Sequence, residues 1–421
     1  MISHKTNRYA IVGAVFALIL SFGCKEPPKC HFEINPGPAA QNQMQTALNT
    51  VKDGCTISLS DGIFEFSRGL TMNSKSNITI KGLSRDDTIL SFENQEHGPD
   101  GLVISNSDNI IVRDLTIRDT IGDALKFTDS QGIVMLRLNT VWSGEPSEEN
   151  GAYGLYPVDS NNILIDDCYA YGASDSGIYV GQSAKAIVRN SRVEGNVIGI
   201  EIENTIEADV YDNVLSDNAS GILVVNLPEL SQNGSRTRIF NNTLTGNNRG
   251  NFAHHGHIAG HVPAGTGILT LSMTDVEIFN NELDENNVVG TAVASYLALV
   301  AIGAEHPPTD PGYNPYPGNV FIHGNSYSSS NNYPPAEEQS DFGNLLVQSF
   351  APNPIPDIIL DGIFVPGSGE SGTICLENNT GDSFVNLNIP DDFPNNVSFD
   401  ASPHNCSLDP LPEVVLNIPQ I

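Results

Sequence analysis

A lysine, two tyrosines and a glutamate are spaced along the sequence so that folding could bring them together. Lys126, Tyr156, Tyr179 and Glu201 follow one another at spacings of 30, 23 and 22 residues. Tyrosine rings stack on the CH faces of sugar rings, while charged groups hydrogen-bond to the sugar hydroxyls. Glu203 follows Glu201 on the same predicted strand, so the two would lie roughly 6.5–7 Å apart, a carboxyl separation that inverting glycosidases use. This set could therefore bind or hydrolyse a glycan, provided that the fold stacks its members.

A repeat that runs through the sequence sets this spacing. Segments similar to GLVISNSDNIIVRDLTI begin at Gly101, Ala124, Gly154, Gly177, Gly199, Gly221, Gly267 and Gly290. Most of them are 22 or 23 residues apart, which is too short for a pair of helices and suits three short strands joined by bends. The second position of seven units is apolar (Leu102, Leu125, Leu155, Ile178, Ile200, Ile222 and Ile268). We therefore predict an all-β chain that forms a single right-handed parallel β-helix, with successive turns ~4.8 Å apart.

The repeat also predicts where particular side chains lie. The third position should point outward and place Lys126, Tyr156, Tyr179 and Glu201 in one row. With Glu203 at the fifth position and Tyr153, which directly precedes Gly154, they form the candidate binding face. The fourteenth position is usually Asp or Asn, which tolerate tight bends and bond to nearby backbone. The recurring first glycine predicts a corner with an unusual backbone dihedral angle.

Two insertions enter at the same corner of the repeat and should wall the candidate binding face. They span residues 142–153 and 249–266, and insertions on one side of a repeat commonly border a binding groove. The second insertion contains His254, His255, His257 and His261. Histidines this close could bind Zn or Cu, but neither Cys nor suitably spaced carboxylates accompany them. We therefore favour a polar loop and predict no metal and no other cofactor.

The ends of the coil need caps, because a stacked coil leaves open strand edges. Met44, Ala47, Leu48 and Val51 fall at helical spacing after Pro38, which predicts a capping helix over the first turn. The part after Gly303 holds 17 of the 26 prolines and should contain the last turns, long loops and an extended tail packed on the coil. The predicted division is a signal peptide over 1–23, an anchor, linker and cap over 24–55, the coil over 56–330 and its last turns and tail over 331–421.

The first 24 residues have the pattern of an export signal. Lys5 and Arg8 precede an apolar run over residues 10–22, which is shorter than the ~20 residues needed to span a bilayer as a helix. The run ends in Gly23-Cys24, which resembles the site at which bacterial lipoproteins are cleaved and lipidated. We predict an exported protein anchored through lipid on Cys24, facing the periplasm or the cell exterior. An ordinary cleaved signal and a retained anchor are the alternatives.

The remaining cysteines fit an oxidising compartment. Cys30 and Cys55 flank the N-terminal segment, and Cys375 and Cys406 flank the C-terminal one. They make two plausible disulfides, although spacing leaves the connectivity open. Cys168 falls at an inward position of the repeat and is expected to be a buried thiol. The formal net charge of −31 would repel a phosphate backbone, which argues against a nucleic acid partner.

The repeat resembles that of pectate-lyase-like, alginate-epimerase-like and NosD-like periplasmic proteins. The segments AYGLYPVDSNN, GASDSGIYVGQS, GIEIEN and VPAGTGI are similar to a family of exported bacterial β-helix lipoproteins, whose activity is not established and whose members tend to occur with a secreted c-type cytochrome. Alginate epimerases and lyases of this fold carry a Tyr-Gly-x-Asp-Pro-His pattern. Tyr153 matches its tyrosine, but Tyr156 and Val158 replace the Asp and the His. Valine cannot transfer a proton, so this resemblance implies that epimerase chemistry is lost at that place.

Three functions follow from these observations. The first is a lipid-anchored β-helix that binds a glycan or a protein partner along the Tyr156–Tyr179 face. The second is a polysaccharide lyase, epimerase or hydrolase of the pectate-lyase-like type, so whether the chain is an enzyme stays open. The third, implied by the resemblance, is an accessory scaffold for a secreted c-type cytochrome or a metal-handling partner. An open aromatic strip would favour binding, and a closed groove with converging charges would favour an enzyme.

Overall fold

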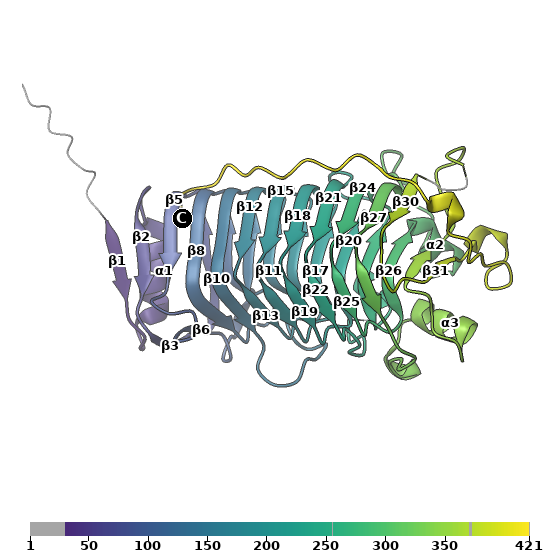
Figure 1. The fold of residues 1–421 in the computed structure, drawn as a ribbon. Coiled ribbons are helices and arrows are strands. Elements are labelled where there is room, and N and C mark those ends of the chain that lie inside the picture. The colour runs from purple at the N-terminus through teal and green to yellow at the C-terminus, as the bar shows by residue number, and fades with distance from the viewer. Residues whose placement is uncertain (1–29, 255, 370–372, 421) are drawn as a thin grey trace, which may run out of the picture.

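The computed structural model describes residues 30–254, 256–369 and 373–420. Strands wind through them as one long coil (Figure 1). Neighbouring strands are parallel, and each pairs with the equivalent strand of the turn before. The predicted all-β parallel β-helix is therefore confirmed. The apolar column is confirmed as well, since Leu102, Leu125, Leu155, Ile178 and Ile200 are paired in succession and fully buried.

Each turn contributes to three faces, which we call A, B and C. Face B is an 11-stranded sheet of β4 (Arg68–Asn73), β7 (His97–Ser105), β9 (Leu125–Thr128), β11 (Tyr153–Val158), β14 (Ser176–Gly181), β17 (Ile198–Glu203), β20 (Ser220–Val225), β23 (Thr266–Leu271), β26 (Val289–Ala294), β29 (Ile358–Leu360) and β31 (Phe384–Asn386). Face A comprises β1 (His31–Ile34), β2 (Thr56–Leu59), β5 (Ser76–Lys81), β8 (Asp108–Arg118), β10 (Gln131–Val141), β12 (Asn161–Asp166), β15 (Ala184–Arg189), β18 (Ile206–Tyr211), β21 (Ser235–Phe240), β24 (Thr274–Phe279), β27 (Gly318–His323) and β30 (Ile374–Glu377). Face C comprises β3 (Gly62–Glu65), β6 (Thr88–Ser91), β13 (Tyr169–Tyr171), β16 (Arg192–Glu194), β19 (Val214–Ser216), β22 (Thr243–Thr245), β25 (Glu282–Asp284) and β28 (Ser326–Ser328), and it joins face A through the long strands β8 and β10.

The first glycine of each repeat is required for a different reason from the one predicted. These glycines do not adopt a left-handed backbone conformation. Instead, a Cβ atom on Gly199 would lie 2.7 Å from the carbonyl oxygen of Gly221 and 2.7 Å from a methyl group of Leu215. The glycine therefore makes room where the coil turns from face C to face B, because the interior is packed too tightly there for any side chain.

The bend between faces A and C follows the prediction. Asp114 and Asn190 have φ of 58° and 51°, and Arg137, which interrupts the pattern, has φ of 50°. A ladder of buried asparagines lies beside this bend. The side chain of Asn242 donates to the carbonyl oxygen of Val210 at 2.9 Å and accepts from the backbone N–H of Asn213 at 3.1 Å. The ladder satisfies polar backbone groups that the bend removes from the strand pairing.

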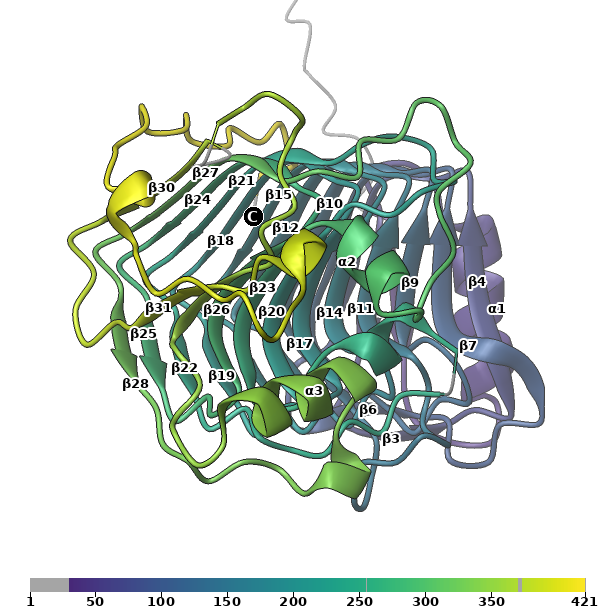
Figure 2. The ribbon, with the colours of Figure 1, turned by 90° about the vertical axis from the view of Figure 1, so that its right-hand side faces the viewer.

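A helix closes the N-terminal end of the coil. Helix α1 (Ala40–Thr50) buries Ala40, Met44, Ala47 and Leu48 at the N-terminal end, as predicted. The remaining helices belong to the C-terminal half: α2 (Tyr296–Ala301), α3 (Asp341–Phe350) and the short 3-10 helices η1 (Ile258–His261), η2 (Ala336–Glu338), η3 (Ile389–Asp391) and η4 (Ser402–His404). Of these, η1 and α2 pack on the outer side of face B. Figure 2 shows α2 and α3 beside the strands of face B. No helix in the described ranges is long and apolar enough to span a membrane.

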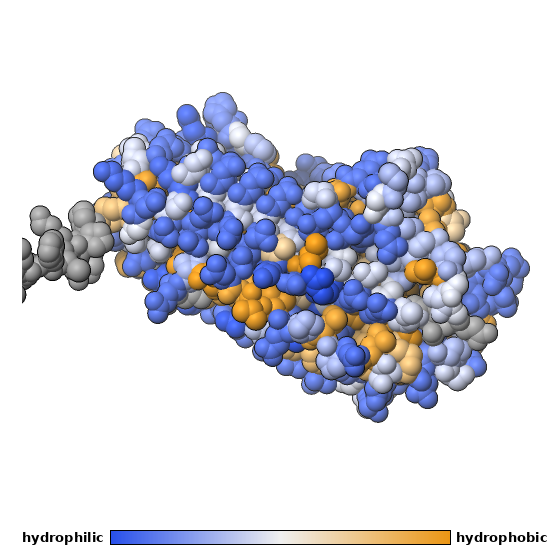
Figure 3. Space-filling view, turned by 90° about the horizontal axis from the view of Figure 1, so that it is seen from above, coloured by the Kyte–Doolittle hydropathy of each residue, from blue (hydrophilic) through white to orange (hydrophobic). Residues whose placement is uncertain are grey.

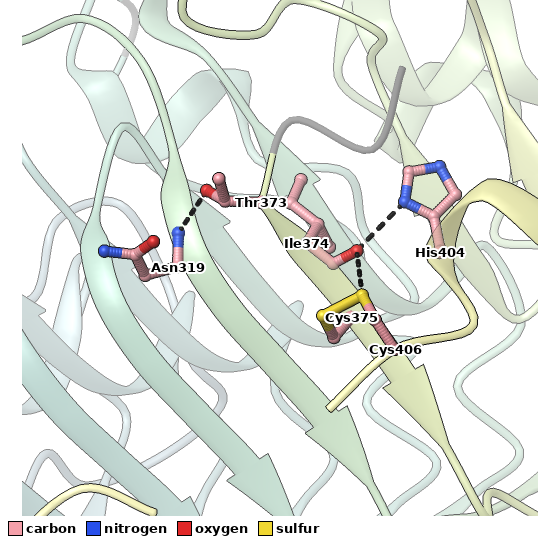
Figure 4. The surroundings of a disulfide bond; sticks show 6 residues. All are labelled: Asn319, Thr373, Ile374, Cys375, His404 and Cys406. Carbon is pink, nitrogen blue, oxygen red and sulfur yellow. Dashed lines mark hydrogen bonds between the residues drawn. A yellow bond between two sulfur atoms is a disulfide. The ribbon is translucent and has the colours of Figure 1, made fainter. Parts of the chain in front are cut away.

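Both predicted disulfides form, Cys30–Cys55 at the first turns and Cys375–Cys406 at the last. Figure 4 shows the second of them, where the buried ring of His404 also contacts the carbonyl oxygen of Ile374 at 3.1 Å. Cys168 is a buried free thiol, as predicted. The disulfides indicate an extracytoplasmic location, since such bonds persist in oxidising compartments.

After the second disulfide, the chain runs back along face A as an extended tail over residues 407–420 (Figure 1). Its backbone N–H groups at Leu411, Val414 and Asn417 donate to side chains of the coil. Figure 3 views the molecule from this side, where the surface is mainly hydrophilic with separate hydrophobic patches. The predicted tail packed on the coil is thus confirmed.

Candidate functional site

The register of face B brings the predicted row together. Lys126 pairs with Tyr156, and Tyr179 pairs with Glu201. Strands β11 and β14 are paired in the same register, which places Tyr156 beside Tyr179. Tyr153 lies at the start of β11 and joins the two other rings, because its centroid is 4.5 Å from that of Tyr156 and 4.8 Å from that of Tyr179.

Although it points outward, much of this row is buried. The exposed fraction is only 4% for Tyr179, 2% for Glu201 and 9% for Glu203, whereas Tyr153 and Tyr156 are partly exposed. These side chains do point out of the coil, as the repeat predicts, but other parts of the chain cover them. Replacing Tyr179 with Ala would therefore remove buried packing.

The second insertion contributes to this cover. Its residues Ala259, Val262 and Ala264 pack into one apolar cluster with Ile198 and Leu223 of face B. The side chain of Gln339, which precedes α3, holds the insertion by bonding both the N–H and the carbonyl oxygen of Ala264, at 2.6 and 2.8 Å. An insertion that sequence alone suggested as a wall of a groove thus packs directly onto the face.

Beneath this cover, two residues that were not predicted connect the row. Tyr153 donates to one carboxylate oxygen of Asp175 at 3.3 Å. The hydroxyl oxygen of Ser176 lies 3.1 Å from the other oxygen of Asp175 and 2.5 Å from a carboxylate oxygen of Glu201. Tyr179 donates to Glu203 at 2.5 Å. We call Tyr153, Tyr156, Asp175, Ser176, Tyr179, Glu201 and Glu203 the tyrosine–carboxylate cluster.

The contacts of Ser176 constrain the protons in this cluster. A serine hydroxyl has one proton to donate, yet it faces two carboxyl groups that would both be acceptors if ionised. One of Asp175 and Glu201 must therefore carry a proton and donate it to the serine oxygen for both contacts to be hydrogen bonds. The result is a continuous chain of hydrogen bonds from the partly exposed Tyr153 to the buried Glu201.

Burial also favours the protonated carboxyl groups. Loss of hydration raises the pKa of Asp175 to about 6 and that of Glu203 to about 7. The pKa of Glu201 is raised well above its usual value, first by burial and then by the negative charges of Asp175 and Glu203. Burial raises the pKa values of Tyr153 and Tyr156 as well, so both remain neutral phenols. At neutral pH the cluster can hold protons that exposed carboxylates would have lost.

The cation at the edge of the cluster is already paired. The ammonium group of Lys126 lies 3.0 Å from a carboxylate oxygen of Asp123 and 4.5 Å from the centroid of the Tyr156 ring. The pKa of Asp123 is raised to about 6, mainly by burial, with Lys126 opposing the shift. The positive charge that the sequence placed in the row is therefore largely neutralised.

Asp175 and Ser176 were missed because both precede the first glycine of their repeat, outside the aligned outward positions. One signal was available, since polar SDS occurs before Gly177 where the next repeat has apolar VI before Gly199. Gly181 gave a second signal. A Cβ atom there would lie 2.1 Å from the Tyr179 hydroxyl oxygen, so its absence lets the tyrosine reach along the strand to Glu203.

Three histidines of the second insertion lie among the described residues, His254, His257 and His261. The rings of His254 and His257 are 5.8 Å apart, whereas Nε2 of His261 lies 3.4 Å from a carboxylate oxygen of Glu305. Among the residues that the structure describes, no three His, Cys, Asp or Glu side chains are placed to hold a metal ion. His255 and the predicted lipidation site Cys24 lie outside the described residues.

Comparison with known proteins supports the fold. The family model described as "Right handed beta helix region" matches residues 100–283, and no curated protein matches the sequence. The A-module of the Azotobacter vinelandii mannuronan C-5 epimerase AlgE4 is 16% identical, over 81% of this chain and 90% of that one, with a TM-score of 0.51. The periplasmic alginate epimerase AlgG is 13% identical, over 70% of this chain and 78% of that one, with a TM-score of 0.44. At 16% identity the likeness to AlgE4 concerns the fold alone, and the chain is a right-handed parallel β-helix.

Proposed function

We propose that this chain binds an oligosaccharide at the tyrosine–carboxylate cluster, with sugar rings resting against Tyr153 and Tyr156. The observation that carries this proposal is the contact of three tyrosine rings on one face, two of which are partly exposed. Partly exposed tyrosine rings offer apolar surface to a sugar together with hydroxyl groups that hydrogen-bond. The carboxyl group of Asp123, at the edge of the cluster, would accept bonds from sugar hydroxyls.

The charge around the cluster favours a neutral or weakly charged glycan. Carboxyl groups surround it, and its cation Lys126 is paired with Asp123. AlgE4, which shares the fold, is by name a mannuronan epimerase, and mannuronan is a polyanion. An anionic polymer would need free basic groups to overcome the field of this face and of a chain with a net charge of −31. We therefore do not extend that substrate to this protein.

Binding can be tested on Tyr156, whose ring is partly exposed. Tyr156→Ala should weaken the binding of a neutral oligosaccharide identified on a glycan array by about two- to tenfold, since one aromatic contact is lost. Tyr171→Ala is the matched control, because that ring is also partly exposed but lies on face C. Equal affinities of the parent and Tyr156→Ala in titration calorimetry would contradict the proposed site.

Glycan hydrolysis is a second candidate, favoured by the raised pKa values of the carboxyl groups. An acid that keeps its proton near neutral pH can protonate a leaving oxygen, and Glu203 meets that requirement. Glu203→Gln should then retain oligosaccharide binding while losing the release of new reducing ends. If the parent protein releases none from any neutral glycan that it binds, the chain is a binding protein.

We also propose that residues 1–23 are a signal peptide and that lipid on Cys24 anchors the protein. The basic residues Lys5 and Arg8, the short apolar run after them and Gly23-Cys24 indicate this. Replacing Cys24 with Ser should abolish acyl labelling and release the protein into the soluble extracytoplasmic fraction. Membrane association that persists in this variant would point to a retained anchor or a protein partner. A secreted c-type cytochrome as partner stays a prediction from the resemblance.

A further inference from the structure

The outward side chains of face B change from polar to apolar immediately after Glu201 and Glu203. Glu201 and Glu203 pair with Leu223 and Val225 of the next turn, and Leu223 pairs in turn with Leu269. These positions all point out of the coil, where the preceding turns carry tyrosine and glutamate. A run of outward apolar side chains must be covered by other parts of the chain to be stable in water.

Three segments cover this apolar run without filling the space above it. They are the second insertion, helix α2 with its following residues, and the start of α3. The cavity that remains has a volume of about 40 Å³ and almost no polar lining. Its wall includes Leu223, Leu269, Val262, Ala298, Leu299 and Phe342. A space of this size holds roughly three water-sized groups, but a cavity so apolar offers water no hydrogen bonds.

A polar pair borders this cavity. His261 contributes to its wall, and its Nε2 atom lies 3.4 Å from a carboxylate oxygen of Glu305. The hydroxyl of Tyr296 donates to the other oxygen of Glu305 at 3.2 Å. A ligand that reached the apolar interior would therefore meet hydrogen-bonding groups at its edge.

We propose that this cavity binds a short aliphatic group, alkyl or acyl, carried by a sugar. The lining selects an apolar group, the volume limits it to a few carbon atoms, and His261 and Glu305 would bond the hydroxyl groups of the carrier. The choice of a sugar as carrier rests on the proposed function. The chain would then recognise a glycan bearing a short aliphatic substituent.

The test compares butyl β-glucoside with methyl β-glucoside in titration calorimetry. The parent protein should bind the butyl compound roughly tenfold or more tightly, because each buried methylene group strengthens binding several-fold. Ala298→Leu, which places a side chain in the cavity, should abolish this preference. Ala301→Leu is the matched control on the same helix, since Ala301 is exposed and outside the cavity. If Ala298→Leu fails to fold, Ala294→Val fills the same cavity by a smaller amount.

Equal affinities for the two glucosides in the parent, or a preference that survives a filled cavity, would overturn the inference. Butanol that binds as tightly as butyl glucoside would overturn the sugar carrier. Tyr156→Ala separates this site from the proposed function. The protein could bind no oligosaccharide at Tyr153 and Tyr156 and yet keep the preference for butyl glucoside in Tyr156→Ala. That result would support binding in the cavity and refute the proposed function.

Discussion

Asp175, Glu201 and Glu203 hold their protons more tightly in the folded chain than they would in water. Raised pKa values mean that folding binds protons, so these groups favour the folded state most at a pH below their ordinary values. Their contribution is lost as the pH rises through the folded values, which are about 6 for Asp175 and about 7 for Glu203. The stability of the protein should therefore decrease between about pH 4 and pH 7.

Glu203→Gln tests this dependence at one residue. The amide stays neutral at every pH and can still accept from Tyr179, so the variant should resist urea better than the parent at pH 8 and about equally at pH 4. Urea unfolding followed by circular dichroism across this range measures the effect. Glu65→Gln, at an exposed position, should leave the pH profile unchanged. Parallel profiles for the parent and Glu203→Gln would show that the buried carboxyl group does not set the dependence.

For single residues, the sequence was sufficient to place Lys126, Tyr156, Tyr179 and Glu201 in one row. A strict repeat puts equivalent positions of successive turns next to one another. The sequence was insufficient to predict the burial of these side chains. The second insertion is fixed by Gln339, 75 residues from Ala264 in the sequence, and such a contact leaves no local pattern. The burial decides the chemistry, because the same carboxyl groups at an exposed surface would lose their protons far below neutral pH.

Among the elements of each turn, the bends impose stricter requirements than the strands do. Strands need only apolar side chains inside the coil, whereas each bend must satisfy polar backbone groups in a narrow space. Asn241 and Asn242 illustrate two different solutions at one bend. Asn241 is exposed with φ of 55°, and Asn242 is buried with its side chain bonded to adjacent turns. The fourteenth position of the repeat predicted the first role but the sequence did not predict the second, since both roles use the same residue type.

Substitution of these neighbours should separate the two roles. Asn242→Ala would leave buried groups of Val210 and Asn213 without partners, at about 1–3 kcal/mol for each group. It should therefore lower the free energy of unfolding by about 3 kcal/mol or more. Asn241→Gly should change it by less than about 1 kcal/mol, because glycine accepts a positive φ. Similar losses in the two variants, measured by urea unfolding, would refute the structural role of the ladder.

At the scale of the whole molecule, the tail joins parts of the chain that the repeat leaves independent. A coil of this kind transmits contacts only between adjacent turns. The tail bonds to Glu277, Asp209 and Asn162 in succession, crossing turns that are 134 to 255 residues away in the sequence. The sequence indicated an extended, proline-containing end but could not show which face this tail covers. The repeat itself carries no signal that part of face A packs against another segment.

Removal of the tail should expose an apolar strip and make the protein self-associate. Leu416 and Ile418 pack against Ile111, Val134, Leu136 and Leu164 of face A, whereas Val415 is 75% exposed. A chain that ends after Cys406 keeps both disulfides but leaves this strip open to water, and exposed apolar patches promote association. Leu416→Ser should act in the same direction but more weakly, and Val415→Ser should behave like the parent. Size-exclusion chromatography with light scattering at several concentrations measures the outcome. A truncated chain that stays monomeric and unfolds at the same urea concentration as the parent would show that the tail adds no stability and that face A tolerates water without it.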